Sequence, residues 1–236
     1  MTQELHPLRV TPFTKNDAEM VDEKFIIAGL LKARDKTIAV MHEIRDALVI
    51  GLTEDEARIL AMEISRKHGA MKHWHKPYIR FGRGTALTFG DPIQPDYKLR
   101  MNDPFYIDLG PIWPDLEEGL DYEGDVGDTF IFGENLIAEE CALTARKIFI
   151  EGQEYWKKAS CSGIELYSYI KQRTEHYGYI LAENVDGHRL SDFSHHKYSK
   201  ERLAQVNFVP QAQLWVLEVQ IIRPDMTCGA FYEDIL

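Results

Sequence analysis

The chain has 236 residues, with 38 Asp or Glu against 27 Lys or Arg, and a formal net charge of −11. Its 44% hydrophobic and 28% charged residues are typical of a globular protein that buries a core without disulfides. The acidic balance argues against nucleic-acid or anionic-membrane surfaces, which need a basic face. No apolar run approaches the roughly 20 residues that span a bilayer. Because three scattered cysteines make no disulfide framework and no secretory signal is visible, we expect a reduced, cytoplasmic protein.

The first third of the chain predicts two helices. Thr14 or Asn16 can cap a long helical pattern that begins at Asp17 and runs past Ile44, and residues 1–16 are interpreted as an N-terminal extension. The sequence Thr-Glu-Asp-Glu at residues 53–56 is a capping box, which predicts a second helix ending near residue 68.

The rest of the chain alternates strand-like and helical segments. Short apolar pieces between Gly and Pro residues predict strands at 86–89 and 104–108, and helices are predicted over 136–151 and after 162–163. The tail predicts two further strands, at 214–222 and 230–236. Two helices followed by strands thus occur twice, which indicates an α+β fold and is the pattern that a duplicated half would give. No linker divides residues 17–236, so we expect a single domain there.

Acidic residues stand inside otherwise apolar strand segments. Glu218, for example, lies between Leu217 and Val219. A buried carboxylate is costly unless it is paired or binds a metal. Each acid could instead be a turn residue, and Glu218 could face solvent on a two-faced sheet. Together they form a set of oxygen ligands plus one imidazole that suits two divalent metals bridged by water: Asp108, Asp125, His188, Glu218 and Glu233.

These motifs resemble those of the methionine aminopeptidase, prolidase and creatinase superfamily, and most closely the aminopeptidase P and prolidase catalytic domain. Asp-x-Gly at 108–110 and Tyr-x-x-Asp at 122–125 match the first two ligand motifs, although the hairpin between the two aspartates is longer here. Gly-His at 187–188, the apolar strand around Glu218, and Glu-Asp at 233–234 match the others. A second family histidine, seven residues after the first, matches His195.

The resemblance implies a pita-bread fold, a pseudo-twofold pair of helix-helix-sheet halves whose curved, mostly antiparallel sheet holds the metal site. It implies a dinuclear hydrolase, aminopeptidase-like or Xaa-Pro peptidase-like, that uses a hydroxide bridging two ions of Mn, Fe, Co or Zn. Asp108 would hold one metal, Asp125 and Glu233 would bridge, and His188 and Glu218 would complete the other. Glu218 would also shuttle a proton, and His195 would hydrogen-bond the oxyanion. The expected partners are a peptide or small-molecule substrate and, in a possible homodimer, a second copy.

Three departures from the family pattern concern the residues around the substrate. Phe89 or Gly90 stands where a family histidine belongs, Asn184 replaces a second histidine, and Phe231 replaces an arginine. The nearby histidines could substitute or could be ordinary surface residues: His68, His73 and His75. The departures leave two alternatives open. One is a non-peptidase member, a hydrolase of a small amide or other C–N bond or a lyase acting on a small metabolite, and the other is a binding module without catalysis.

Overall fold

The computed structural model describes residues 16–236 except 71, 116 and 118. The predicted extension, 1–16, and the candidate cap Thr14 lie outside these residues apart from Asn16, so the domain boundary stays a prediction. The helices are α1 (Ile27–Ala47), α2 (Glu54–Lys67), α3 (Leu136–Ala159) and α4 (Gly163–His176), with short 3-10 turns at Asp17–Glu19, Gly82–Ala86, His195–Lys197 and Leu203–Gln205. The strands are β1 (Lys72–His73), β2 (Tyr78–Phe81), β3 (Pro104–Leu109), β4 (Pro111–Asp115), β5 (Leu120–Glu123), β6 (Val126–Ile131), β7 (Ile180–Leu181), β8 (Val216–Ile222) and β9 (Gly229–Ile235).

The helix predicted from the capping box at 53–56 is present, and so are those predicted over 136–151 and after 162–163. Thr53 and Glu56 form the reciprocal bonds of a capping box at the start of α2, and Ser162 and Glu165 do the same for α4. These bonds satisfy backbone N–H groups that have no partner inside the helix. Helix α3 begins at the predicted residue but continues to Ala159, beyond the predicted end at residue 151.

The start of the first helix was predicted wrongly. Asn16 caps only a 3-10 turn, and α1 begins at Ile27, ten residues after the predicted start. The reason is a tertiary contact, because the buried Glu19 side chain accepts hydrogen bonds from the Trp215 indole at 2.8 Å and the Gln211 backbone at 2.7 Å. These contacts with the other half of the chain hold the entry segment away from a continuous helix.

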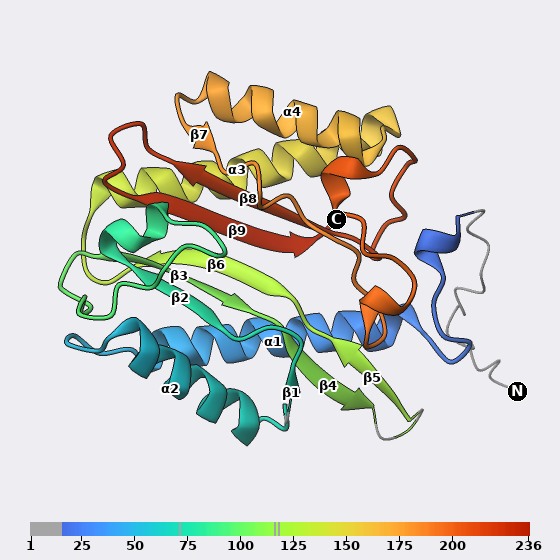
Figure 1. The fold of residues 1–236 in the computed structure, drawn as a ribbon, viewed down its shortest axis with the longest axis horizontal. Coiled ribbons are helices and arrows are strands. Elements are labelled where there is room, and N and C mark those ends of the chain that lie inside the picture. Colours follow the sequence, from blue (N-terminus) through green and yellow to red (C-terminus); the bar gives the residue numbers. More distant parts are fainter. Residues whose placement is uncertain (1–15, 71, 116, 118) are drawn as a thin grey trace, which may run out of the picture.

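Two antiparallel sheets hold the strands together. The larger has the order β2-β3-β6-β9-β8-β7, and the smaller has the order β1-β4-β5. Figure 1 shows the α1–α2 pair beside the β2-β3-β6 half of the larger sheet and the α3–α4 pair beside the β9-β8-β7 half, so the arrangement of two helices followed by strands occurs twice. The strand predicted at 86–89 is wrong, since Ala86 ends a 3-10 turn and the next three residues form a loop.

Alternation along the central strands separates a core face from a polar face. Asp234 in β9 pairs with Arg34 of α1, whereas its neighbour Glu233 points into a cavity on the opposite face of the sheet. In β8, Leu217 and Val219 are fully buried in the core, while Glu218 between them lines that cavity. Successive strand residues point to opposite faces, so a mid-strand Glu reaches the cavity without disturbing the core.

The strand register places acidic residues in one row across the large sheet. Tyr78 of β2 is paired with Asp108 of β3, which is paired with Gly127 of β6. Gly127 is in turn paired with Glu233 of β9, and Glu233 with Glu218 of β8. Directly paired residues share a face of the sheet. Residues more than a hundred positions apart in the chain therefore project from the same face.

Candidate metal centre

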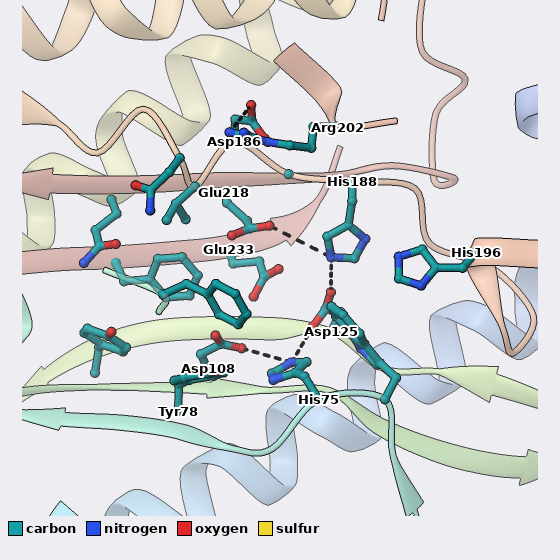
Figure 2. A pocket seen from close by; sticks show the side chains of 18 residues that line it. His75, Tyr78, Asp108, Asp125, Asp186, His188, His196, Arg202, Glu218 and Glu233 are labelled. Atoms are coloured by element: carbon teal, nitrogen blue, oxygen red, sulfur yellow. Dashed lines mark hydrogen bonds and ion pairs between the residues drawn. The ribbon is translucent and has the colours of Figure 1, made fainter. Parts of the chain in front are cut away.

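A cavity of about 390 Å³ lies over this row. All five predicted metal ligands line it: Asp108, Asp125, His188, Glu218 and Glu233. Figure 2 shows Asp125 at the centre of a chain of polar contacts that begins at Glu218 and ends at Asp108. Apolar and aromatic side chains also line the cavity: Tyr78, Phe89, Tyr106, Val185 and Phe231.

Asp125 is fully buried and is shared by two groups of ligand atoms. One group is Asp125, His188 and Glu233, and the other is His75, Asp108 and Asp125. His188 Nε2 lies 2.9 Å from Asp125 Oδ2 and 3.9 Å from Glu218 Oε1. Although burial acts in the opposite direction, the neighbouring imidazoles of His188 and His75 lower the pKa of Asp125 to about 2. Asp125 therefore lies where one carboxylate can serve both groups.

The other carboxyl groups show the cost of crowding acids away from water. Burial raises the pKa of Asp108 to about 6 and that of Glu218 to about 8. Burial and the charges of its neighbours raise the pKa of Glu233 well above its usual value. Divalent cations relieve such repulsion, and carboxylate plus imidazole is a donor set that binds them. The residues present thus fit a divalent metal centre.

His195 lies beside this centre rather than in the cavity wall. Its ring stacks on His188 with a centroid distance of 4.8 Å, and its Nδ1 lies 2.8 Å from Glu123 Oε2. Its backbone N–H donates to Glu123 Oε1 at 3.1 Å. His195 Nε2 is buried without a hydrogen-bond partner among the described residues. The exposed His196, by contrast, lines the cavity.

Sequence reasoning missed Glu123, a fully buried acid that holds His195 in place. Burial raises the pKa of Glu123 to about 8 and lowers the pKa of His195 to about 2. The protonated Glu123 carboxyl can then donate to Nδ1, which leaves the hydrogen of the neutral ring on Nε2. The only signal for Glu123 was its place two residues before Asp125, in the motif at 122–125.

The three histidines named as possible substitutes have different surroundings. His75 enters the site, with Nε2 3.3 Å from Asp108 Oδ1 and 3.5 Å from Asp125 Oδ1. His68 is exposed and lies 2.6 Å from Glu43, outside the cavity, and His73 does not line it either. The sequence could not separate His73 from His75, because they lie on the same short segment.

The departures from the family pattern gather at this cavity. Phe89, Asn184 and Phe231 all line it, whereas the alternative position Gly90 does not. Phe89 packs on Tyr78 at a ring-centroid distance of 5.1 Å, and Phe231 packs on Tyr106 at 5.5 Å. Asn184 donates to the Thr88 hydroxyl at 3.0 Å. The wall next to the acids is therefore more aromatic and less basic than the family motif predicts.

Comparison with known proteins agrees with this geometry. The model of metallopeptidase family M24 matches residues 28–235, and the chain belongs to that family. It is similar to the prolidase from Pyrococcus horikoshii OT3, with a TM-score of 0.67 and 21% identity over 91% of this chain and 59% of that one. It is also similar to the X-Pro aminopeptidase from Thermotoga maritima MSB8, with a TM-score of 0.70 and 19% identity over 92% of this chain and 59% of that one. No curated protein matches the chain.

A shorter relative matches over nearly its whole length. The methionine aminopeptidase from Thermotoga maritima has a TM-score of 0.63 and 16% identity, covering 92% of this chain and 93% of that one. These likenesses confirm the α+β pita-bread fold, and the family match confirms the resemblance to the methionine aminopeptidase, prolidase and creatinase superfamily. The chain spans 59% of the prolidase and of the X-Pro aminopeptidase. In the part of the chain that the structure describes, no helix combines the length and hydrophobicity needed to cross a bilayer.

Proposed function

We propose that this chain is a dinuclear metal-dependent hydrolase that cleaves the amide bond of a peptide, in the manner of an aminopeptidase or Xaa-Pro peptidase. The observation that carries the proposal is the position of Asp125, which belongs to both groups of ligand atoms in one cavity. Membership of a metallopeptidase family supports it. A cytoplasmic location and a homodimer remain predictions.

The side chains have distinct roles in this proposal. Asp108 would hold one ion, His188 and Glu218 would hold the other, and Asp125 and Glu233 would serve both. Two bound ions of Mn, Fe, Co or Zn would supply Lewis acidity and a nucleophile at neutral pH. Glu218 accepts and returns the proton of the attacking water, and His195 donates from Nε2 to the oxygen on which charge develops.

A non-peptidase activity on the same scaffold is the second candidate. It is favoured by Phe89, Asn184 and Phe231, which line the cavity where the family motif has two histidines and an arginine. The aromatic side chains in the wall suit a small substrate with an apolar group, such as a small amide. In that case the metal centre is the same and only the substrate class differs.

Asp125→Asn tests the proposal because it removes one anionic oxygen from the shared carboxylate. We expect the variant to fold, to lose metal in elemental analysis, and to lose turnover. Asp96→Asn, which changes an exposed acid that does not line the cavity, is the control and should match the wild type. Wild-type metal content and turnover in Asp125→Asn would refute the shared position.

A substrate panel separates the two candidates. The metal-loaded protein is assayed on Xaa-Pro dipeptides, on longer peptides with a free N-terminus, and on small amides and betaines. Cleavage of peptides supports the first candidate, whereas turnover confined to the small compounds supports the second. Metal-loaded protein that turns over nothing in the panel would count against both.

A further inference from the structure

We propose that His75 is a sixth protein ligand of the metal centre and completes the metal position on the Asp108 side. This inference rests on the proposed dinuclear function. The five-residue set predicted from the sequence contains one imidazole, His188, and it leaves the Asp108 side with oxygen donors alone. His75 gives each side of Asp125 one imidazole, as Figure 2 shows.

The two histidines are oriented in the same way. His75 Nδ1 lies 2.8 Å from the backbone carbonyl of Lys76, and His188 Nδ1 lies 2.7 Å from that of Arg189. A carbonyl oxygen can only accept, so Nδ1 donates in each ring and Nε2 is the atom left for a metal. A hydrogen bond from the second ring nitrogen is the usual support of a metal-binding histidine.

The separations on the His75 side are those of atoms around a single ion. Ligand bonds of about 2.1 Å at a tetrahedral angle put two ligand atoms about 3.4 Å apart. His75 Nε2 is 3.3 Å from Asp108 Oδ1 and 3.5 Å from Asp125 Oδ1. The three side chains can therefore contact one ion without a large movement.

The surrounding structure holds His75 in this position. The Trp74 indole meets its ring edge-on at a centroid distance of 4.3 Å, and Tyr78 stacks on it at 5.8 Å. Gly110 is needed here, because a Cβ at that position would overlap both the His75 ring and the Trp74 indole. A metal site is well defined when packing fixes the side-chain conformations of its ligands.

The lengthened hairpin between the two aspartates explains how His75 reaches the site. The hairpin strands β4 and β5 form a small sheet with β1, in which His73 is paired with Pro111. Trp74 N–H then donates to the Gly110 carbonyl at 2.9 Å, two residues after Asp108. The hairpin thus binds the segment before β2 and directs the next residue, His75, toward Asp108.

A second imidazole changes the metals that this position prefers. Imidazole suits Zn, Co and Fe, whereas carboxylates alone suit Mn and Mg. With His75, the Asp108 side should prefer Zn or Co to Mn. Without His75, only oxygen donors remain there. The affinity for Zn or Co should then fall more than the affinity for Mn.

Cobalt titration of the metal-free protein tests the inference. Bound Co(II) is counted by elemental analysis after dialysis, and its visible absorption reports the nitrogen ligands. We expect two equivalents in the wild type. In His75→Ala, the affinity for the second equivalent of cobalt should fall. The loss should be at least the roughly 10- to 100-fold that follows removal of a group that only supports a metal ligand. His75→Gln, which fills more of the space, should show the same loss, and added free imidazole should restore binding to His75→Ala.

His68→Ala is the matched control, since it removes an exposed imidazole that contacts Glu43 and not the cavity. It should bind two equivalents with the wild-type spectrum. Two equivalents with unchanged affinity and spectrum in both His75 variants would overturn the inference and leave the proposed function standing. A wild-type protein that binds no cobalt would overturn the proposed function as well.

Discussion

Glu123 holds His195 through two hydrogen bonds, one from the His195 backbone N–H at 3.1 Å and one with ring atom Nδ1 at 2.8 Å. This pair fixes the position and the tautomer of an imidazole that stacks on the candidate ligand His188. Nε2 is left as the buried ring atom that has no hydrogen-bond partner among the described residues. The arrangement is suited to a residue that acts on the substrate without binding metal.

His195→Ala should keep both metals and the fold but lose activity. A donor that acts mainly in the transition state lowers kcat and kcat/KM together, and loss of one such donor costs about 10²- to 10³-fold. The measurements are steady-state kinetics and metal content. His176→Ala, which removes an exposed imidazole at the end of α4, is the control. Loss of metal in His195→Ala would show that His195 is a ligand instead.

Glu123→Gln should retain most of the activity that Glu123→Ala loses. A glutamine keeps both hydrogen bonds, because its oxygen accepts from the His195 backbone and its NH₂ group donates to Nδ1. It mimics the protonated carboxyl that burial favours by raising the pKa of Glu123 to about 8. Kinetics of both variants near neutral pH check this. Equal losses in the two variants would mean that the Glu123 charge itself is required.

Metal affinity should rise with pH. Burial raises the pKa of Glu218 to about 8, and the hydrogen bond with Asp125, although burial opposes it, raises the pKa of His188 to about 10. Near neutral pH the metal-free protein therefore carries protons at Glu218 and His188 that a metal must displace. Deprotonation of these groups favours metal binding. For each proton that the metal displaces, the metal affinity should increase about tenfold per pH unit. Titration calorimetry in buffers of different ionisation enthalpy measures the proton release, and heats that do not depend on the buffer would contradict it.

Gly127→Ala should disturb the site through packing rather than charge. A Cβ at Gly127 would overlap the Phe231 ring and lie 3.3 Å from Glu233 Oε2. Overpacking of this kind costs about 1–3 kcal/mol. We expect a lower midpoint of thermal unfolding and weaker metal binding. The double variant Gly127→Ala with Phe231→Ala should recover part of both, and a single variant as stable as the wild type would show that the ring moves freely.

Local sequence determined the elements whose signals lie within a few residues. The capping box at Thr53 predicted the start of α2, because the side chains that satisfy the first N–H groups are neighbours in the chain. The motifs around Asp108, Asp125, His188, Glu218 and Glu233 placed the candidate ligands on or beside strands. Alternation in β8 also separated Glu218 from its core neighbours. Such features depend only on chain geometry.

Tertiary structure decided what those elements bring together. The register across four strands aligned Asp108, Glu233 and Glu218, and no local pattern encodes that pairing. The partner of Glu19 is Trp215, nearly two hundred residues later, so the delayed start of α1 could not be seen in the sequence. His75 reached the centre only because the β4–β5 hairpin pairs with β1. Contacts between distant segments depend on packing free energy summed over the whole fold, and short windows of sequence do not carry it.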